Sequence, residues 1–429
     1  MLKEKEEVEG VKNTEGDSNN NSITWEKGGE EAIGRDEVVI MAYLTLTHYQ
    51  FKVKRNPGHG RYNILKTNFF NFPKGSKPFT DLLGDLLRQG IFNVDGHSWS
   101  SQRKLASHEF STRSLRSFAF EVLREEVETR IVPVLSTAAD VGTTVDLQDV
   151  FKRFAFDVVC KVSLGWDPNC LDLTRPVKPL AEAFDTAAEI SARRATEPLY
   201  AVWKAKRVLN VGSERRLREA IRTVHELVSE IVRAKRKSLE IGTGQEAKQD
   251  LLSRFLAAGH DSEVVRDMVI RFEELKEMSY MKACLCEAMR LYPPVSWDSK
   301  HAANDDVLPT RVKKGDKVTY FPYGMGRMEN LWGNDCEEFK PNRWFHSEPG
   351  ITEPILKPVS PFKFPVFQAG PRVCIGKEMA FMQMKFVVGS VLSRFEIIPV
   401  SKQKPVFVPL LTAHMAGGLK VKIKRREVK

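Results

Sequence analysis

Apolar residues recur at helical spacing over most of this chain, and only a few short stretches are continuously apolar. Helical spacing predicts helices over residues 79–87, from Trp99 through Arg116, as a series over 119–240, around 284–290 and over 377–395. Short apolar runs predict strands at residues 38–46, 49–53, 395–400 and 419–423. The pattern therefore predicts a mainly α protein with small β-sheets.

Composition divides the chain into two parts. Residues 1–37 are rich in Glu, Asn, Gly and Ser and carry eleven acidic and five basic side chains, so we expect a disordered acidic tail. Residues 38–429 contain no linker or repeat, and 42% of all residues are hydrophobic, so we expect a single large domain there. The net charge of +10 includes −6 from the tail, which leaves +16 on the body.

That positive charge has two interpretations. It suits contact with an anionic membrane surface or an acidic protein partner, and it also suits ordinary solvated faces. No interleaving of aromatic and basic residues indicates nucleic acid. The apolar run at 38–46 is far shorter than the roughly 20 residues of a membrane-spanning helix, so we expect no transmembrane anchor in this chain.

Residues 367–376, Phe-Gln-Ala-Gly-Pro-Arg-Val-Cys-Ile-Gly, are the stretch with the clearest chemistry. Cys374 precedes a predicted helix, whose dipole favours a thiolate together with nearby cations. Arg372 supplies a fixed cation two residues earlier. A lone cysteine in a turn is more often structural, but this pattern suits a thiolate bound to a metal in a flat cofactor. Cys284 and Cys286, by contrast, face different ways on a predicted helix, so core packing explains them better than a metal site.

The ten residues match Phe-x-x-Gly-x-Arg-x-Cys-x-Gly at every fixed position, which resembles the haem-binding signature of the cytochrome P450 family. The resemblance covers roughly residues 55–429. It implies the cytochrome P450 fold, haem b (iron protoporphyrin IX) as cofactor, Cys374 as its axial metal ligand, and electrons from NADPH through a reductase. It also implies a location at the endoplasmic reticulum membrane.

Further motifs carry expected cofactor contacts. Trp99 and Arg103 share a helix face and are able to donate to one carboxylate, although in isolation a core tryptophan beside a solvated arginine is the more common explanation. The motif resembles the family's Trp-x-x-x-Arg, which holds a haem propionate. Lys300 is the first candidate for another propionate contact and His301 the second, with a solvated position as the alternative for both.

Glu287 and Arg290 are three residues apart on a predicted helix, and Arg343 lies in Phe339-x-Pro341-x-Arg343. These motifs resemble the family's Glu-x-x-Arg and meander. We expect the three residues to form a buried structural lock and to take no part in catalysis.

One segment departs from the family pattern. The family's oxygen-activating helix carries Ala-Gly-x-Asp-Thr, and only 25 residues separate Asp261 from Glu287 here. Residues 258–262, Ala-Gly-His-Asp-Ser, resemble that motif superficially, but residues 262–270 look like the start of the long helix rather than its end. We therefore expect an internal deletion near Ile270 and Arg271, which leaves the fold incomplete. For the same reason we assign no catalytic residue in this chain.

Phrases such as Ile64-Leu-Lys-Thr and residues 90–96 resemble a plant branch of the family that hydroxylates fatty acids or jasmonoyl-amino acid hormones at the chain end. The leading expectation is thus an NADPH- and O2-dependent omega-hydroxylase-like monooxygenase with a fatty-acid-like substrate. The first alternative is a non-catalytic truncated remnant. A hydroperoxide isomerase or lyase is the second, disfavoured because those relatives carry an insertion in the cysteine loop.

Overall fold

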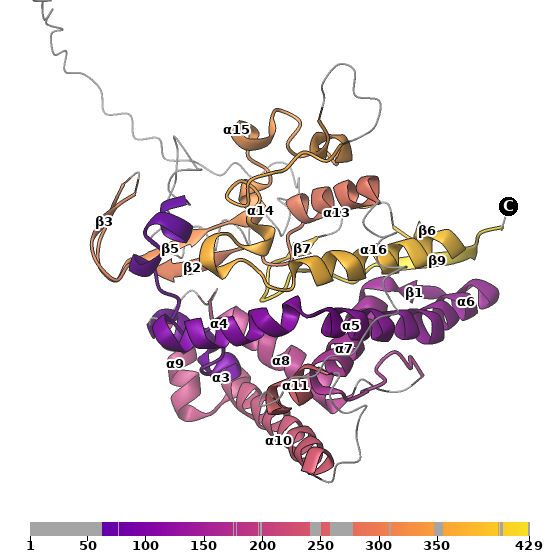
Figure 1. Ribbon diagram of the computed structural model, residues 1–429, viewed down its shortest axis with the longest axis horizontal. Helices are drawn as coiled ribbons and strands as arrows, with labels where there is room; N and C mark the ends of the chain where they lie inside the picture. Colours follow the sequence, from indigo (N-terminus) through magenta and orange to yellow (C-terminus); the bar gives the residue numbers. More distant parts are fainter. Residues whose placement is uncertain are drawn as a thin grey trace, which may run out of the picture.

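The computed structural model describes residues 62–75, 77–174, 176, 178–195, 197, 200–240, 250–257, 278–308, 310–346, 355–401, 403 and 406–427 (Figure 1). The expected acidic tail, the two strands expected before residue 54, the Ala258–Ser262 motif and the junction at Ile270 and Arg271 lie outside these residues.

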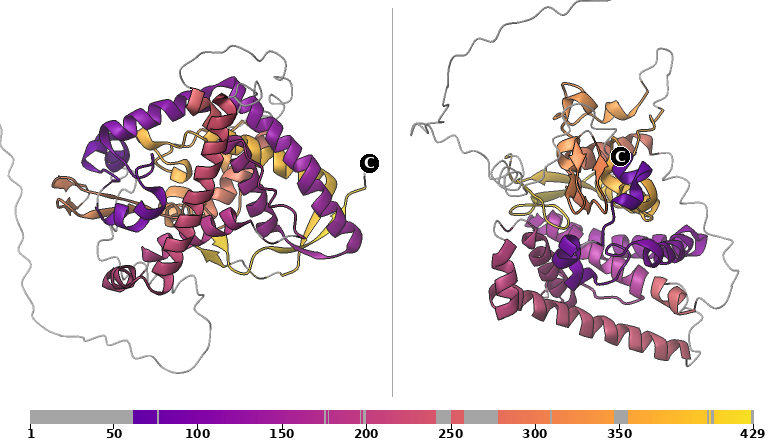
Figure 2. Two further views of the ribbon diagram at one scale, coloured as in Figure 1. Left: turned by 90° about the horizontal axis from the view of Figure 1, so that it is seen from below. Right: turned by 90° about the vertical axis from the view of Figure 1, so that its left-hand side faces the viewer.

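The described elements form two layers, which Figures 1 and 2 show from three directions. The lower layer holds helices α3 (Lys77–Leu87), α4 (Gly96–Ser111), α5 (Arg113–Glu126), η3 (Val127–Ile131), α6 (Val132–Val141), α7 (Leu147–Leu164), α8 (Pro179–Arg194), α9 (Tyr200–Leu209), α10 (Gly212–Glu240) and α11 (Leu251–Ala257). The upper layer holds helices α13 (Ser279–Leu291), α14 (Pro322–Met325), α15 (Glu329–Trp332) and α16 (Lys377–Arg394), with short turns η1 (Asn63–Thr67), η2 (Phe69–Asn71), η5 (Pro341–Trp344), η6 (Pro365–Phe367) and η7 (Gly370–Arg372).

The strands are short and pair antiparallel. They are β1 (Thr144–Asp146), β2 (Asp298–His301), β3 (Asp306–Val307), β4 (Arg311–Val312), β5 (Lys317–Tyr320), β6 (Phe395–Pro399), β7 (Phe407–Val408), β8 (His414–Met415) and β9 (Lys420–Arg425). β9 pairs with β1 on one side and β6 on the other, while β2–β5, β3–β4 and β7–β8 form separate pairs. The mainly α fold with small sheets is confirmed, as are the predicted strands after residue 394.

The main core lies where the two layers meet. Buried residues of α5, α6 and α7 pack there against Val387 and Val391 of α16 and against Val421 of β9. A second core, with Leu65 and Tyr320 among its members, joins η1 to strands β4 and β5. Both cores use residues distant in sequence, and Ala369 of the loop before α16 belongs to the second one.

One predicted helix is interrupted. The helix expected to run from Trp99 through Arg116 is two helices, because Thr112 adopts an extended ψ of 138°. The Thr112 hydroxyl accepts a hydrogen bond from the N–H of Leu115 and caps α5. Threonine competes with the helix for backbone hydrogen bonds in this way, so the chain turns there.

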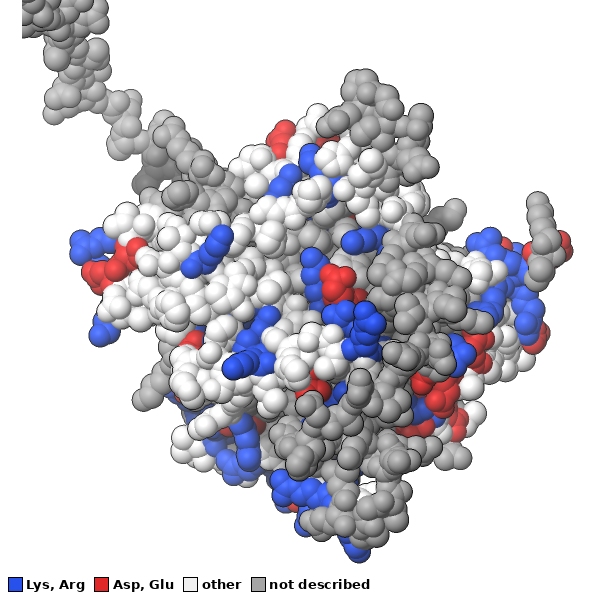
Figure 3. All heavy atoms as spheres, in the orientation of Figure 1, with Lys and Arg blue, Asp and Glu red and all other residues white. Residues whose placement is uncertain are grey.

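On the face shown in Figure 3, Lys and Arg side chains stand in small groups with Asp and Glu among them. This mixture suits ordinary solvated faces there. No helix in the described residues is both long and apolar enough to pass through a bilayer.

Candidate functional site

Cys374 lies in a loop that closes on itself just before α16. Its N–H donates to the carbonyl oxygen of Phe367 at 2.8 Å. Gly370 has φ +68°, and a Cβ at that position would overlap the carbonyl oxygen of Leu65. Glycine alone therefore lets the loop pass this close to η1. The Cys374 side chain is exposed beside the N-terminus of a helix that begins at Lys377, so its sulfur is accessible to a metal.

Cys374 also differs from the other five cysteines, all of which the structure describes. Cys284 is half-buried, and the buried ones are Cys160, Cys170, Cys286 and Cys336. Burial raises the pKa of Cys160 and Cys170 to about 12 and the pKa of Cys286 to about 11. These buried thiols stay protonated at neutral pH, and the exposed Cys374 is the cysteine best placed to bind a metal.

Helix α4 carries Trp99 and Arg103 toward the cysteine loop. Nη1 of Arg103 donates to the carbonyl oxygen of Val373 at 2.6 Å, which sets its guanidinium next to the residue preceding Cys374. Burial lowers the pKa of Arg103, and the nearby Cys374 acts in the opposite direction. The Trp99 ring lies 4.7 Å from the guanidinium carbon of Arg372. The structure thus brings these three candidates together at one loop.

Arg372 contacts a carboxylate within the protein. Its Nη2 donates to Oδ1 of Asp95 at 2.7 Å and to the carbonyl oxygen of Val94 at 2.7 Å, and its Nη1 donates to that of Ile91 at 3.3 Å. Burial lowers the pKa of Arg372, and Asp95 opposes that change. Asp95 stands at the N-cap position of α4, yet its side chain does not cap that helix.

Lys300 is a buried ammonium group on β2, with 1% of its surface exposed. Its Nζ has no hydrogen-bond partner among the described residues and lies 4.6 Å from the ring centroid of Phe69. Burial lowers its pKa to about 8, with Asp298 opposing the change. A buried charge without a hydrogen-bonded partner is costly, so this position favours an added anionic group.

His301, the second candidate, is also buried, and neither ring nitrogen has a hydrogen-bond partner among the described residues. Burial lowers the pKa of His301 to about 4, and Lys317 acts in the same direction. The ring is therefore neutral at physiological pH. Lys300, whose pKa leaves it mostly charged at pH 7, suits an anion better.

The donor set fits haem. A flat ring with a metal at its centre and carboxylates at its edge needs a ligand to the metal and cations at the rim. Cys374 presents an exposed sulfur, and Lys300 presents a buried cation that lacks a hydrogen-bond partner among the described residues. Arg103 and Arg372 add two further cations beside the same loop.

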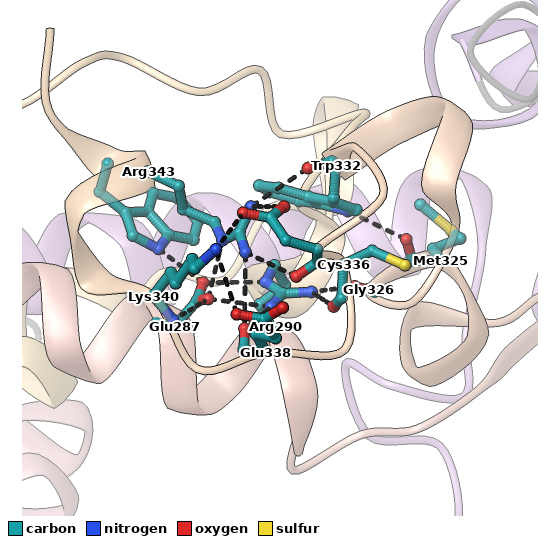
Figure 4. Close-up of polar contacts among 11 residues, drawn as sticks. Glu287, Arg290, Met325, Gly326, Trp332, Cys336, Glu338, Lys340 and Arg343 are labelled. Carbon is teal, nitrogen blue, oxygen red and sulfur yellow. Dashed lines mark hydrogen bonds and ion pairs between the residues drawn. The ribbon is translucent and has the colours of Figure 1, made fainter. Parts of the chain in front are cut away.

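A separate buried network surrounds Glu287 (Figure 4). Its carboxylate accepts hydrogen bonds from Nε of Arg290 at 2.8 Å, Nε of Arg343 at 2.8 Å, Nε1 of Trp344 at 3.0 Å and the N–H of Lys340 at 2.8 Å. The Nη groups of Arg290 also donate to carbonyl oxygens of Gly326, Cys336 and Glu338. The structure therefore brings together the three residues that the two motifs singled out, in a cluster that joins α13 to η5.

Comparison with known proteins agrees with this geometry. The cytochrome P450 family profile matches residues 60–264 and 261–422. The chain belongs to the cytochrome P450 family. Cytochrome P450 94B3 of Arabidopsis thaliana is 78% identical over 419 residues, covering 87% of this chain and 82% of the relative. Cytochrome P450 94B1 of the same plant is 70% identical (85% and 80% covered), and cytochrome P450 94A1 of Vicia sativa is 40% identical (85% and 80%).

These alignments contain positions that this cytochrome P450 lacks. The alignment with the 94B3 protein is 419 residues long but takes in 87% of 429 residues, about 373, so about 46 aligned positions have no residue here. The family profile matches in two blocks that meet at residues 261–264.

Sequence reasoning missed the acidic partners of the loop. Asp95 contacts Arg372, Asp298 contacts Gln368, and Lys74 contacts both carboxylates. The one local signal is that Asp298 and Lys300 are two apart on a short strand and so share a face. Nothing local indicates that residues 74, 95 and 298 meet.

Proposed function

We propose that this chain is a haem-thiolate monooxygenase that hydroxylates a fatty acid or a fatty-acid-derived hormone at the chain end. In this proposal Cys374 would hold the haem iron through its sulfur. The observation that carries it is the exposed sulfur of Cys374 in a loop bordered by Arg103, Arg372 and the buried Lys300. Haem held by a thiolate supplies dioxygen activation, because the thiolate pushes electron density toward the iron.

The surrounding residues bind and orient the ring. Lys300 would pair with one propionate and thereby gain the hydrogen-bonded anionic partner that it lacks within the described residues. Arg103 donates to the Val373 carbonyl of the loop, and Arg103 and Trp99 would together hold a propionate. Arg372 completes the cationic rim while Asp95 fixes its guanidinium plane. Glu287, Arg290 and Arg343 stabilise the region without touching the reactants.

The substrate class is inferred from sequence phrases that resemble plant chain-end hydroxylases, and it is supported by relatives from plants. Electrons come from NADPH through a reductase that docks on the cysteine side, as in the family. We place the protein at the endoplasmic reticulum membrane on the same resemblance.

A second candidate function is a non-catalytic remnant. The two-block family match and the roughly 46 unmatched positions support an internal deletion at the place where the family carries its oxygen-activating helix. A chain without those residues keeps the cysteine loop but lacks the groups that deliver protons to bound oxygen.

Two measurements separate these candidates. The purified chain is titrated with haemin, and the Soret band and the red-shifted carbonyl band of the reduced protein are recorded. Oxygen consumption is then followed with a plant NADPH-dependent reductase and a medium-chain or long-chain fatty acid. Both bands with substrate-dependent oxygen use support the monooxygenase, bands without oxygen use support the remnant, and ligation by nitrogen overturns both.

A further inference from the structure

Asp298 is a buried carboxylate with a full set of partners, and one of them belongs to the cysteine loop. It is 5% exposed. Its Oδ2 accepts hydrogen bonds from the Tyr320 hydroxyl at 2.6 Å and from Nε2 of Gln368 at 2.8 Å, while its Oδ1 pairs with Nζ of Lys74 at 2.8 Å. Burial raises the pKa of Asp298, but Lys74, Tyr320 and Gln368 outweigh it, and the pKa lies below its usual value. The group is therefore ionised at neutral pH.

Gln368 is the residue at which the cysteine loop turns. Its φ is +63° and its ψ is 176°, a backbone conformation that is strained for a residue other than glycine. Its side chain contacts both Asp298 and the hydroxyl of Tyr320, which face each other across the β2–β5 pair. These contacts compensate for the strained backbone by tying it to a rigid strand pair.

A second arm of the same polar chain reaches the loop closer to Cys374. The N–H of Lys74 donates to Oδ1 of Asp95 at 3.0 Å, and that carboxylate holds Arg372 at 2.7 Å. Lys74 thus joins two carboxylates, Asp298 through its side chain and Asp95 through its backbone. The two carboxylates hold the loop at positions six and two residues before Cys374.

We infer that Asp298 is a positioning residue for the cysteine: through Gln368 it fixes the turn of the loop and with it the point at which Cys374 presents its sulfur. The inference rests on the proposed function, in which that sulfur binds iron. Asp298 and Lys300 lie two apart on β2, so one strand carries both the carboxylate that holds the loop and the cation proposed to bind a haem propionate.

The test compares three variants by hydrogen exchange and by spectroscopy. Asp298→Asn removes the charge. Gln368→Glu places a second carboxylate against the first. The double variant exchanges the carboxylate and the amide between the two positions, so that an amide again donates to a carboxylate. Asp140→Asn, which removes an exposed carboxylate paired with Arg425, is the matched control.

Hydrogen exchange is measured on the protein without haem, for the peptide that spans residues 365–376. In Asp298→Asn we expect its exchange to accelerate about tenfold or more, the loss expected for one hydrogen bond to a charged group. Helix α7, residues 147–164, is the internal reference and keeps its exchange rate. The double variant recovers protection, and Asp140→Asn changes neither peptide.

After haemin is added, a smaller fraction of the reduced Asp298→Asn protein than of the parent should show the red-shifted carbonyl band. The double variant should recover that fraction. Exchange that accelerates equally in α7 and in the loop, or in neither, overturns the inference, as does an unchanged share of the band. A parent that never shows the band refutes the proposed function instead, while the exchange result still reports whether Asp298 holds the loop.

Discussion

Nε of Arg343 donates to Oε1 of Glu287 at 2.8 Å although the two residues are 56 positions apart in the sequence. Glu287 comes from helix α13 and Arg343 from the turn η5, so their contact fixes the meander against the helix. Glu287 is fully buried and Arg290 is 1% exposed. Glu287 and Arg290 thus form the desolvated centre of the ion cluster, and the loss of one partner leaves an uncompensated charge there.

Replacing Glu287 by glutamine should lower the free energy of unfolding by about 3–5 kcal/mol, because the Arg290 and Arg343 guanidinium groups then lose the anionic partner that they share. Chemical denaturation of the purified variant measures this loss. Glu128→Gln, which removes an exposed carboxylate paired with Arg394, should cost less than about 1 kcal/mol. Equal effects of the two substitutions would show that the buried cluster has no special weight.

The same network predicts a dependence on pH. Burial raises the pKa of Glu287, but hydrogen bonds from Arg290, Lys340, Arg343 and Trp344 outweigh burial and leave the pKa below its ordinary value. The stabilisation is therefore complete above about pH 4.3, the ordinary pKa of glutamate, and is lost as the pH falls through the lower pKa of the folded state.

Stability measured between pH 3 and pH 6 should accordingly fall less steeply toward acid in Glu287→Gln than in the parent. If the two profiles run parallel, Glu287 does not titrate with folding. Glu128→Gln again serves as the control for the loss of one carboxylate.

Replacing Lys300 by methionine should stabilise the protein without haem and weaken haem binding. Its pKa of about 8 lies below the ordinary value of 10.5, so the folded state resists the charge. The resulting penalty, of order 3 kcal/mol, is fully present below pH 8 and is relieved as the pH rises toward the pKa of the unfolded state. Methionine removes that penalty and also removes the cation offered to a propionate.

Thermal unfolding of the haem-free protein at pH 7 and a haemin titration measure the two effects. Lys420→Met, at an exposed lysine paired with Asp146, should change neither by much. A Lys300→Met variant that is less stable without haem, or that binds haem as tightly as the parent, contradicts the prediction.

Replacing Cys374 by serine should abolish the red-shifted carbonyl band and leave the free energy of unfolding within about 0.5 kcal/mol, because the side chain is exposed. Cys284→Ser, at a half-buried cysteine of α13, should keep the band. The absorption spectra of the two reduced variants treated with carbon monoxide are compared. A band that survives in Cys374→Ser excludes this sulfur as the ligand.

The parts of this molecule that sequence alone predicts are those with local periodicity or a fixed motif. Trp99 and Arg103 share α4, and Glu287 and Arg290 share α13, because a spacing of three or four residues sets a helix face. The motif that contains Arg343 added one contact across the fold. In each case a short spacing or a known motif carried the information.

The features that sequence did not predict depend on packing between distant segments. Asp95 looks like an ordinary helix N-cap, yet its carboxylate holds Arg372 instead. Thr112 looks like one residue of a continuous helix, yet its extended backbone starts a new one. Such alternatives are close in local energy, and the neighbours that select one of them come from tertiary structure.

Restoring the missing positions tests whether the internal deletion limits this protein. The residues of the 94B3 relative that have no counterpart here, about 46 aligned positions in all, are supplied as one insert between Ile270 and Arg271, where the sequence predicts the junction. Burial of apolar surface stabilises a protein by roughly 25 cal/mol per Å². The total free energy contributed by burying the surface under a long apolar helix is therefore comparable to the whole stability of about 5–15 kcal/mol. The lengthened chain should therefore unfold at higher denaturant concentration, bind haemin with a stronger Soret band and consume oxygen with substrate.

An insert of equal length in scrambled order is the control. A parent chain that already matches the lengthened one in stability and Soret intensity would show that the fold does not need the segment, and the remnant hypothesis would then rest on oxygen consumption alone.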